Sequence, residues 1–127
     1  MDEFEQAASL FKALGHPVRV QIIEVLARDG EACVCHLECL LGQRQPQISQ
    51  HLMRLKEAGL VTGRREGLNI YYSLVDREIL PLLQASTRIA ERFAGLEGRK
   101  GQPRGIAAPT RECPCPKCNL AAAPVVT

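Results

Sequence analysis

Three cysteines lie close together in the first third of the chain, at positions 33, 35 and 39. Cysteine thiolates are soft ligands, so such a group favours thiophilic ions like As(III), Sb(III), Cd(II) or Pb(II) over Mg²⁺ or Ca²⁺. A lone cysteine is more often a small buried hydrophobe. Three cysteines within seven residues instead predict a metal or metalloid site formed by Cys33, Cys35 and Cys39.

The spacing of these cysteines predicts how they could act together. We expect a short helix over residues 33–41, in which residues two apart point about 200° away from each other. Cys33 and Cys35 could then share an ion only if the start of the helix unwound. Cys35 and Cys39 lie one turn apart and can share an ion without unwinding. The sequence therefore predicts that binding through Cys33 and Cys35 distorts this helix.

A second cysteine cluster, Cys113, Cys115 and Cys118, is interrupted by Pro114 and Pro116 near the end of the chain. Cys115 and Cys118 have the Cys-x-x-Cys spacing of zinc and redox sites. This cluster could close over the first one, from the same or another subunit, and supply further sulfurs. It could also form an independent soft-metal site, or take no part in sensing.

The elements that position these residues follow from apolar periodicity, capping residues and turn residues. Two β-prone runs separated by a turn-rich stretch predict a hairpin, and Asp76 is a suitable N-cap for the last helix. From residue 98 the periodicity ends and Gly and Pro become frequent, which predicts a domain of residues 1–97 and a flexible basic tail of residues 98–127. The predicted helices are 3–14, 17–29, 33–41, 46–58 and one from about Asp76 to Phe93, with strands at 60–62 and 69–74.

A short helix, a glycine turn, a second helix and a hairpin, in that order, predict a mainly α fold with a winged helix-turn-helix. Residues 46–58 would be its recognition helix, with Ile48, Leu52 and Leu55 facing the core. We interpret His51 as a packing residue. Gln can bond adenine edges, and Arg can bind guanine or a phosphate. The candidate DNA contacts are Gln47, Ser49, Gln50 and Arg54 on this helix, and Arg64 and Arg65 at the hairpin tip.

Charge and composition limit the partners of the chain. Residues 98–127 carry five basic side chains against one acidic, and residues 1–97 carry 11 against 13, so DNA must be bound by a local patch. No apolar run approaches the roughly 18 residues that span a bilayer. The acidic start, Met1-Asp2-Glu3, does not resemble a secretory signal. We therefore expect a cytoplasmic protein whose thiols are free or bind metal.

Five segments together resemble one known family, the ArsR/SmtB family of metal-responsive repressors, over roughly residues 5–95. They are His-Pro-Val-Arg at 16–19, Cys-Val-Cys at 33–35, Gln-Pro-Gln-Ile-Ser-Gln-His-Leu at 45–52, Leu-Lys-Glu-Ala-Gly-Leu-Val at 55–61 and Tyr-Tyr-Ser-Leu at 71–74. The resemblance implies a homodimer formed through the first and last helices. It also implies that this dimer holds double-stranded operator DNA until a metal or metalloid loosens it. A two-fold dimer predicts an inverted repeat in the operator.

The resemblance also bears on the inducer. Similar arsenic-sensing members bind trivalent arsenic through Cys-Val-Cys and a nearby third cysteine. This chain departs in having His36 where Asp is usual, and in placing Cys39 one position later. Its final helix carries the carboxylates Asp76, Glu78 and Glu91 but no histidine, and no cysteine precedes position 33. Both absences favour As(III) or Sb(III) over zinc-type or other cadmium and lead sites.

The predicted function is a repressor that binds operator DNA as a homodimer and is released when As(III) or Sb(III) binds cysteine thiolates. One alternative is a repressor of the same fold that senses Cd(II), Pb(II), Zn(II) or thiol oxidation. Another is a small thiol enzyme that uses Cys115 and Cys118. An enzyme is disfavoured because prolines surround this motif, and because the chain shows no βαβ pattern, nucleophile–base pair or phosphate loop.

Overall fold

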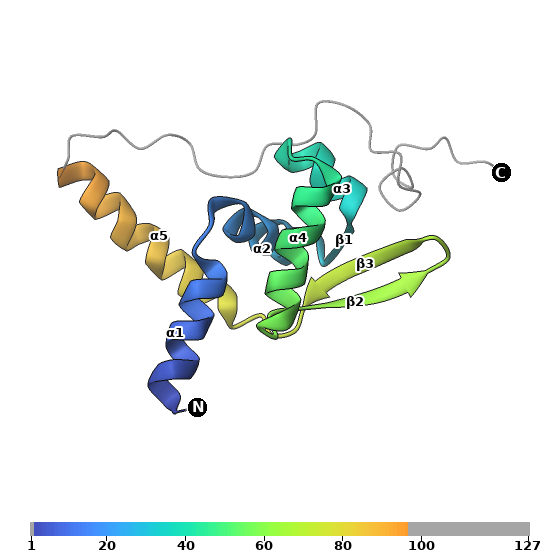
Figure 1. Cartoon of the computed structure of the whole chain (residues 1–127). Helices are drawn as coiled ribbons and strands as arrows, with labels where there is room; N and C mark the ends of the chain where they lie inside the picture. The colour runs from blue at the N-terminus through green and yellow to red at the C-terminus, as the bar shows by residue number, and fades with distance from the viewer. Residues whose placement is uncertain (1, 97–127) are drawn as a thin grey trace.

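In the computed structural model, residues 2–96 are described and form five helices and three strands. The fold is mainly helical with a β-hairpin, as predicted (Figure 1). The tail predicted for residues 98–127 lies outside the described residues. In chain order the elements are α1 (Glu3–Leu14), α2 (Pro17–Asp29), β1 (Glu31–Cys33), α3 (Val34–Leu41), α4 (Gln45–Glu57), β2 (Val61–Glu66), β3 (Asn69–Leu74) and α5 (Ile79–Leu96).

Local capping explains where the helices begin and end. Asp2 caps α1 by accepting a hydrogen bond from the Glu5 N–H at 2.8 Å. His16 caps α2 in the same way, through Nδ1 and the Val18 N–H. The bounds predicted for these two helices agree with the structure. Asp76 instead accepts from the Glu78 N–H in the turn before α5, so that helix begins three residues later, at Ile79.

The sheet contains a strand that sequence reasoning did not predict. β1 pairs antiparallel with β3, which also pairs with β2, giving the order β1-β3-β2. Three residues are too few to show a period-two pattern, so β1 is defined by its partner strand rather than by its own sequence. Its register places Cys33 opposite Tyr71. The residues before α3 are therefore tied to the hairpin.

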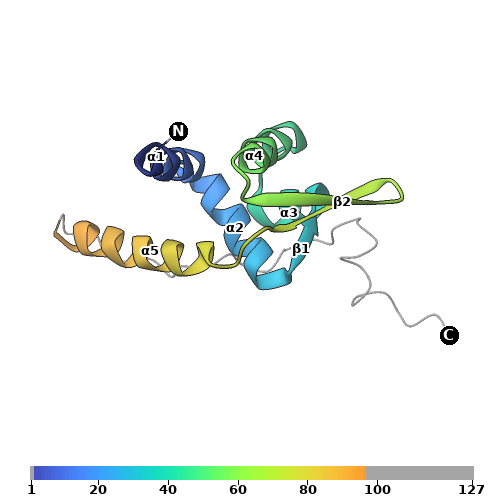
Figure 2. The same ribbon diagram turned by 90° about the horizontal axis from the view of Figure 1, so that it is seen from below.

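The core is centred on α2, whose Ile22, Ile23, Val25 and Leu26 are fully buried. The helix pair α3 and α4 packs on α2 through side chains that are equally buried. Figures 1 and 2 show α1 and α5 on the side of this core that is opposite to the hairpin. The fully buried side chains of α3 and α4 are Leu37, Ile48, Leu52 and Leu55.

Among residues 2–96, no helix combines the length and apolar character needed to cross a lipid bilayer.

Leu37 offers a direct test of how α3 is held in place. It is fully buried in the core, so Leu37→Ala should lower the free energy of unfolding by about 2–5 kcal/mol, through lost apolar contact and the cavity that remains. Leu68 at the hairpin turn is fully exposed, and Leu68→Ala is the control that should leave stability unchanged. Urea denaturation of the full chain measures both. Equal stability of the two variants would show that α3 does not pack as described.

Candidate thiol site and nucleic-acid interface

Cys33 and Cys35 lie side by side where β1 ends and α3 begins. Cys33 has extended backbone (φ −90°, ψ 170°) and precedes the first helical residue, Val34. Its Sγ lies 3.0 Å from Sγ of Cys35, a thiol–thiol hydrogen bond. The prediction that α3 must unwind to bring these sulfurs together was wrong. It assumed a helix from residue 33, whereas pairing with β3 holds Cys33 in a strand.

Tyr71 organises the surroundings of the thiol pair. Cys33 is buried against Tyr71, and the half-buried Cys35 and Cys39 pack against the same small cluster. Cys39 thus shares the side of α3 that faces the pair. Within residues 2–96, however, no three His, Cys, Asp or Glu side chains are gathered closely enough to hold a metal ion. The described cysteines thus supply a ready pair of sulfurs without an assembled third donor.

A cleft of about 300 Å³ opens beside Cys33 and is lined by charged side chains as well as Tyr71. On its wall, Nε2 of His36 lies 2.8 Å from Oδ2 of Asp29, whose Oδ1 accepts a hydrogen bond from Nε of Arg28. These contacts, chiefly the one from Arg28, hold the pKa of the Asp29 carboxyl below its usual value despite partial burial. The sequence singled out His36 only as a departure from the resembled family. Its position next to Cys35 in the chain was the available signal.

The cysteines of the second cluster, Cys113, Cys115 and Cys118, lie outside the described residues. Their three possible roles are untested by the structure.

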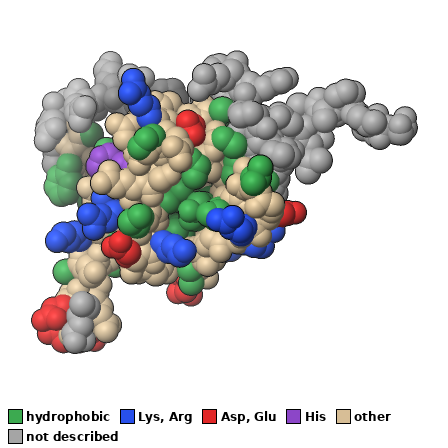
Figure 3. Space-filling view, turned by 45° about the vertical axis from the view of Figure 1, so that its right-hand side comes forward, with side chains coloured by type: hydrophobic (Ala, Val, Ile, Leu, Met, Phe, Trp, Pro, Cys, Tyr) green, Lys and Arg blue, Asp and Glu red, His purple; other side chains and the backbone are tan. Residues whose placement is uncertain are grey.

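The predicted recognition helix, α4, buries and exposes the faces that its sequence indicated. Ile48, Leu52 and Leu55 are buried in the core. On the remaining surface lie the predicted DNA contacts, of which Ser49 is half-buried and the others are exposed. Figure 3 shows Lys and Arg side chains spread over one face of the molecule, with acidic side chains among them. The exposed side chains of α4 include Gln47, Gln50, Met53 and Arg54.

Arg64 and Arg65 do not lie at the hairpin tip, contrary to the sequence prediction. β2 continues to Glu66, with Arg64 opposite Tyr71 and Arg65 opposite Ile70, so the turn consists of residues 67 and 68. Gly67 there adopts the left-handed backbone (φ 62°) that such a tight turn requires. The predicted turn began at Arg64 because charged residues were interpreted as loop, although both arginines are exposed residues of a strand.

The two arginines of β2 differ in their surroundings. The Arg64 guanidinium forms ion pairs with Glu31 and Glu66, both at 2.9 Å, and lies over the Tyr71 ring. It therefore joins β1 to the hairpin. Arg65 is exposed on the same strand.

His51 on α4 is a packing residue, as predicted, and it contacts the first turn of α2 through a hydrogen bond and a ring contact. Its Nδ1 accepts a hydrogen bond from Nε of Arg19 at 3.1 Å, and its ring lies 4.3 Å from that of His16 between centroids. Burial, followed by the charges of His16 and Arg19, lowers the pKa of His51. The neutral form that can accept the Arg19 hydrogen bond is therefore the favoured one.

The fold and the exposed face of α4 define a winged helix-turn-helix protein, and comparison with known proteins identifies its family. Residues 16–62 match the family described as bacterial regulatory protein, arsR family. An HTH-type transcriptional regulator of Methanocaldococcus jannaschii, itself uncharacterised, is 46% identical over 86 residues, covering 65% of this chain and 97% of that protein. The chain therefore belongs to the arsR family of bacterial regulatory proteins.

Two further relatives show what is known among similar chains. The arsenic resistance transcriptional regulator ArsR2 of Pseudomonas putida is 34% identical over 102 residues, which cover 74% of this chain and 89% of that protein. A homodimeric winged helix-turn-helix DNA-binding domain of Mycobacterium bovis has a solution structure with a TM-score of 0.62 at 31% identity, covering 79% of this chain and 90% of that one. These relatives are transcriptional regulators, so the chain is a regulator and not an enzyme.

The shifted pKa of His51 predicts a pH dependence of stability. Folding lowers this pKa below its ordinary value of about 6.5, so the folded state favours neutral His51. The contribution of neutral His51 to folding stability is therefore lost as the pH falls below about 6.5. The Tm of the wild type should therefore fall more steeply between about pH 7.5 and 5.5 than the Tm of His51→Gln. Calorimetry across this range gives both slopes. Parallel curves would show that His51 does not titrate with folding.

Proposed function

We propose that this chain is a transcriptional repressor that binds operator DNA as a homodimer in the cytoplasm and is released when As(III) or Sb(III) binds its cysteines. The observation that carries this proposal is the 3.0 Å separation of the Cys33 and Cys35 sulfurs at the start of the helix-turn-helix. Its DNA-binding surface is α4 with the hairpin. The relative from P. putida, named as an arsenic resistance regulator, supports the choice of inducer.

The surface of α1 and α5 supports the proposed homodimer. Phe4 and Phe11 on α1 and Ile89 and Phe93 on α5 are large apolar side chains with about half or more of their surface exposed. An apolar surface of this kind is typical of a protein interface. The related domain from M. bovis is homodimeric. A two-fold dimer would present two copies of α4 to an inverted repeat in the DNA.

In the DNA complex, α4 would enter the major groove. Gln47, Ser49 and Gln50 would face base edges and phosphates from its first half, and Arg54 from its second half. Arg65 is exposed on β2 and would contact the DNA backbone. Arg64 would do so only by exchanging its carboxylate partners for phosphate, because Glu31 and Glu66 hold it in this structure.

The thiol pair fits the proposed inducer in its chemistry and, in part, in its number of ligands. Soft thiolates bind thiophilic ions strongly, and Cys33 and Cys35 require no change of backbone to meet. A third sulfur has to come from elsewhere. The two sources are Cys39, one turn further along α3, and the cluster of Cys113, Cys115 and Cys118, which would bind together with the pair or form a separate site.

Movement of Cys39 toward the pair would link inducer binding to DNA binding. Cys33 is held by its pairing with β3 and Cys39 lies on α3, so an ion bound by both sulfurs would shift α3 relative to β1. Leu37 on α3 is buried against the same core as α4, and this shift would displace the recognition helix. A 10²-fold loss of DNA affinity corresponds to a coupling of about 3 kcal/mol, and DNA would weaken inducer binding by the same factor.

The same sulfur geometry favours a second candidate signal, thiol oxidation. Two thiols in contact can be joined in a disulfide by a cellular oxidant that accepts two electrons, with release of both thiol protons. Cd(II), Pb(II) and Zn(II) also bind thiolates and are alternative inducers. An enzyme that uses Cys115 and Cys118 does not agree with a family of transcriptional regulators.

Substitution of the thiol pair tests the proposed function. Cys33→Ser and Cys35→Ser should leave DNA affinity within about twofold of wild type, because neither residue lies on the DNA-binding face, and should abolish release by arsenite. The measurement is fluorescence anisotropy of a labelled duplex, selected by the protein from a random pool, titrated with arsenite in the presence of reductant.

The remaining cysteines supply the matched controls for this experiment. If Cys39 is the third ligand, Cys39→Ser should raise the arsenite concentration needed for release. If the second cluster supplies the third ligand, the double variant Cys115→Ser/Cys118→Ser should raise that concentration instead. Titration with Cd(II), Pb(II) and Zn(II) in parallel separates the alternative inducers, and oxidation without metal tests the redox signal. Release by arsenite that survives both Cys33→Ser and Cys35→Ser would contradict the proposed site.

A further inference from the structure

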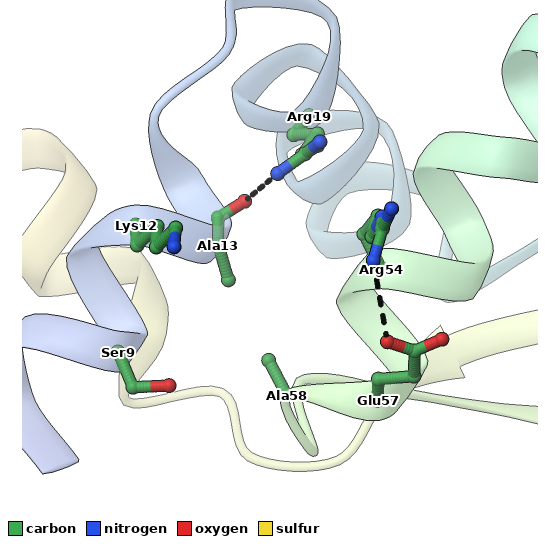
Figure 4. A pocket seen from close by; sticks show the side chains of 7 residues that line it. All are labelled: Ser9, Lys12, Ala13, Arg19, Arg54, Glu57 and Ala58. Carbon is green, nitrogen blue, oxygen red and sulfur yellow. Dashed lines mark hydrogen bonds and ion pairs between the residues drawn. The ribbon is translucent and has the colours of Figure 1, made fainter.

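Three basic side chains border a cleft between α1 and α4, and only one of them, Arg54, is a predicted DNA contact. The cleft has a volume of about 550 Å³. Lys12 comes from α1, Arg19 from α2 and Arg54 from α4, with Ser9 and Glu57 also on its walls (Figure 4). No sequence pattern groups these residues, because 42 positions separate Lys12 from Arg54.

The cleft concentrates positive charge in a domain that has no net positive charge overall. Residues 2–96 hold 11 Lys and Arg side chains against 12 Asp and Glu. Within that part of the chain, neither Lys12 nor Arg19 forms an ion pair with a carboxylate. Glu57, the acidic side chain of the cleft, contacts only Arg54 among the three, and at a long 3.7 Å. The cleft therefore carries a net positive charge that an anion would balance.

Arg19 is already fixed in position at this cleft. It is half-buried, and its Nη1 donates to the Ala13 carbonyl at 3.2 Å while its Nε donates to Nδ1 of His51 at 3.1 Å. These bonds join the end of α1 to the recognition helix and leave the side chain little freedom to lose on binding. A guanidinium held in this way is preorganised for an oxyanion.

The position of the cleft indicates which anion it would meet. A helix with its side chains is about 10–12 Å across, and the major groove is about 12 Å wide, so a helix seated there has a sugar–phosphate backbone along each flank. The hairpin lies on one flank of α4, and α1 lies on the other (Figure 1). The hairpin can reach one strand of the DNA, and the cleft lies where the other strand would pass.

We propose that Lys12, Arg19 and Arg54 bind a backbone phosphate of the DNA strand on the flank of α4 that faces away from the hairpin. This inference rests on the proposed function only in taking α4 as the DNA-binding helix. It adds α1 to the DNA-binding surface, with Lys12 and Arg54 supplying charge from opposite walls and Arg19 supplying fixed donors between them. Such a site positions the protein on DNA without reading its sequence.

The salt dependence of DNA binding tests this site in the full chain without any metal or metalloid. Lys12→Gln should make the slope of log K against log salt shallower by about one unit per subunit, or about two per dimer. It should weaken binding by the same factor to a duplex selected from a random pool and to a scrambled duplex of equal composition. Lys12→Arg keeps the charge and should restore the wild-type slope.

Arg88→Gln is the matched control, since it removes one exposed charge from α5, a helix that takes no part in the cleft. Its slope should equal that of the wild type. An unchanged slope for Lys12→Gln, or an equal change for Arg88→Gln, would overturn the proposed phosphate site. Absence of DNA binding by the wild type would instead refute the proposed function, so the two failures are distinguishable.

A free phosphate compound is the other source of the same chemistry. Calorimetric titration of the DNA-free protein with inorganic phosphate, at ionic strength matched with chloride, distinguishes a site for DNA phosphate from a site for a free phosphate compound. The proposal predicts that inorganic phosphate at millimolar concentration binds only weakly to the wild type, that Lys12→Gln weakens this binding further, and that the same variant makes the DNA salt slope shallower. Phosphate binding that Lys12→Gln abolishes, together with an unchanged DNA salt slope, would assign the cleft to a free anion and contradict the proposal.

Discussion

The rest of the structure depends on a change of backbone conformation between Cys33 and Val34. Cys33 is extended because β1 pairs with β3, and the next residue begins α3. This junction holds the buried Cys33 against Tyr71 and brings the Cys35 sulfur to it. It also sets where α3 starts, and α3 packs with α4 in the same core. A ligand held by the thiol pair is therefore held at the base of the DNA-binding unit.

Much of this fold follows from local signals in the sequence. The bounds of α1 and α2 and the apolar face of α4 are encoded within a few residues, and those predictions are confirmed. β1 could not be predicted in the same way, because it exists only through pairing with residues 71–73, some forty positions away. The error at the thiol site follows from that omission. A cysteine taken as helical was in fact the last residue of a strand.

The site residues likewise divide into those that local sequence patterns predict and those that depend on long-range contacts. The exposed face of α4 was predictable from helical periodicity, because exposure within one helix is a local property. The contacts of Arg64 with Glu31, of Arg19 with His51 and of His36 with Asp29 join different elements, and no spacing rule reveals them. Arg19 is the most informative of these, since it links α1, α2 and α4 at the cleft. Through α1, the proposed dimer surface and the DNA-binding surface are parts of one connected structure.

X-ray absorption at the arsenic edge tests the central claim most directly, because it counts the sulfur atoms bound to arsenic in the arsenite complex of the full chain. The account predicts sulfur ligands in the wild type and a loss of two of them in the Cys33→Ser/Cys35→Ser double variant, with arsenic binding much weakened. An identical sulfur shell and undiminished binding in the double variant would contradict it. Arsenic would then be held elsewhere, and the thiol pair at the strand–helix junction would not be the inducer site.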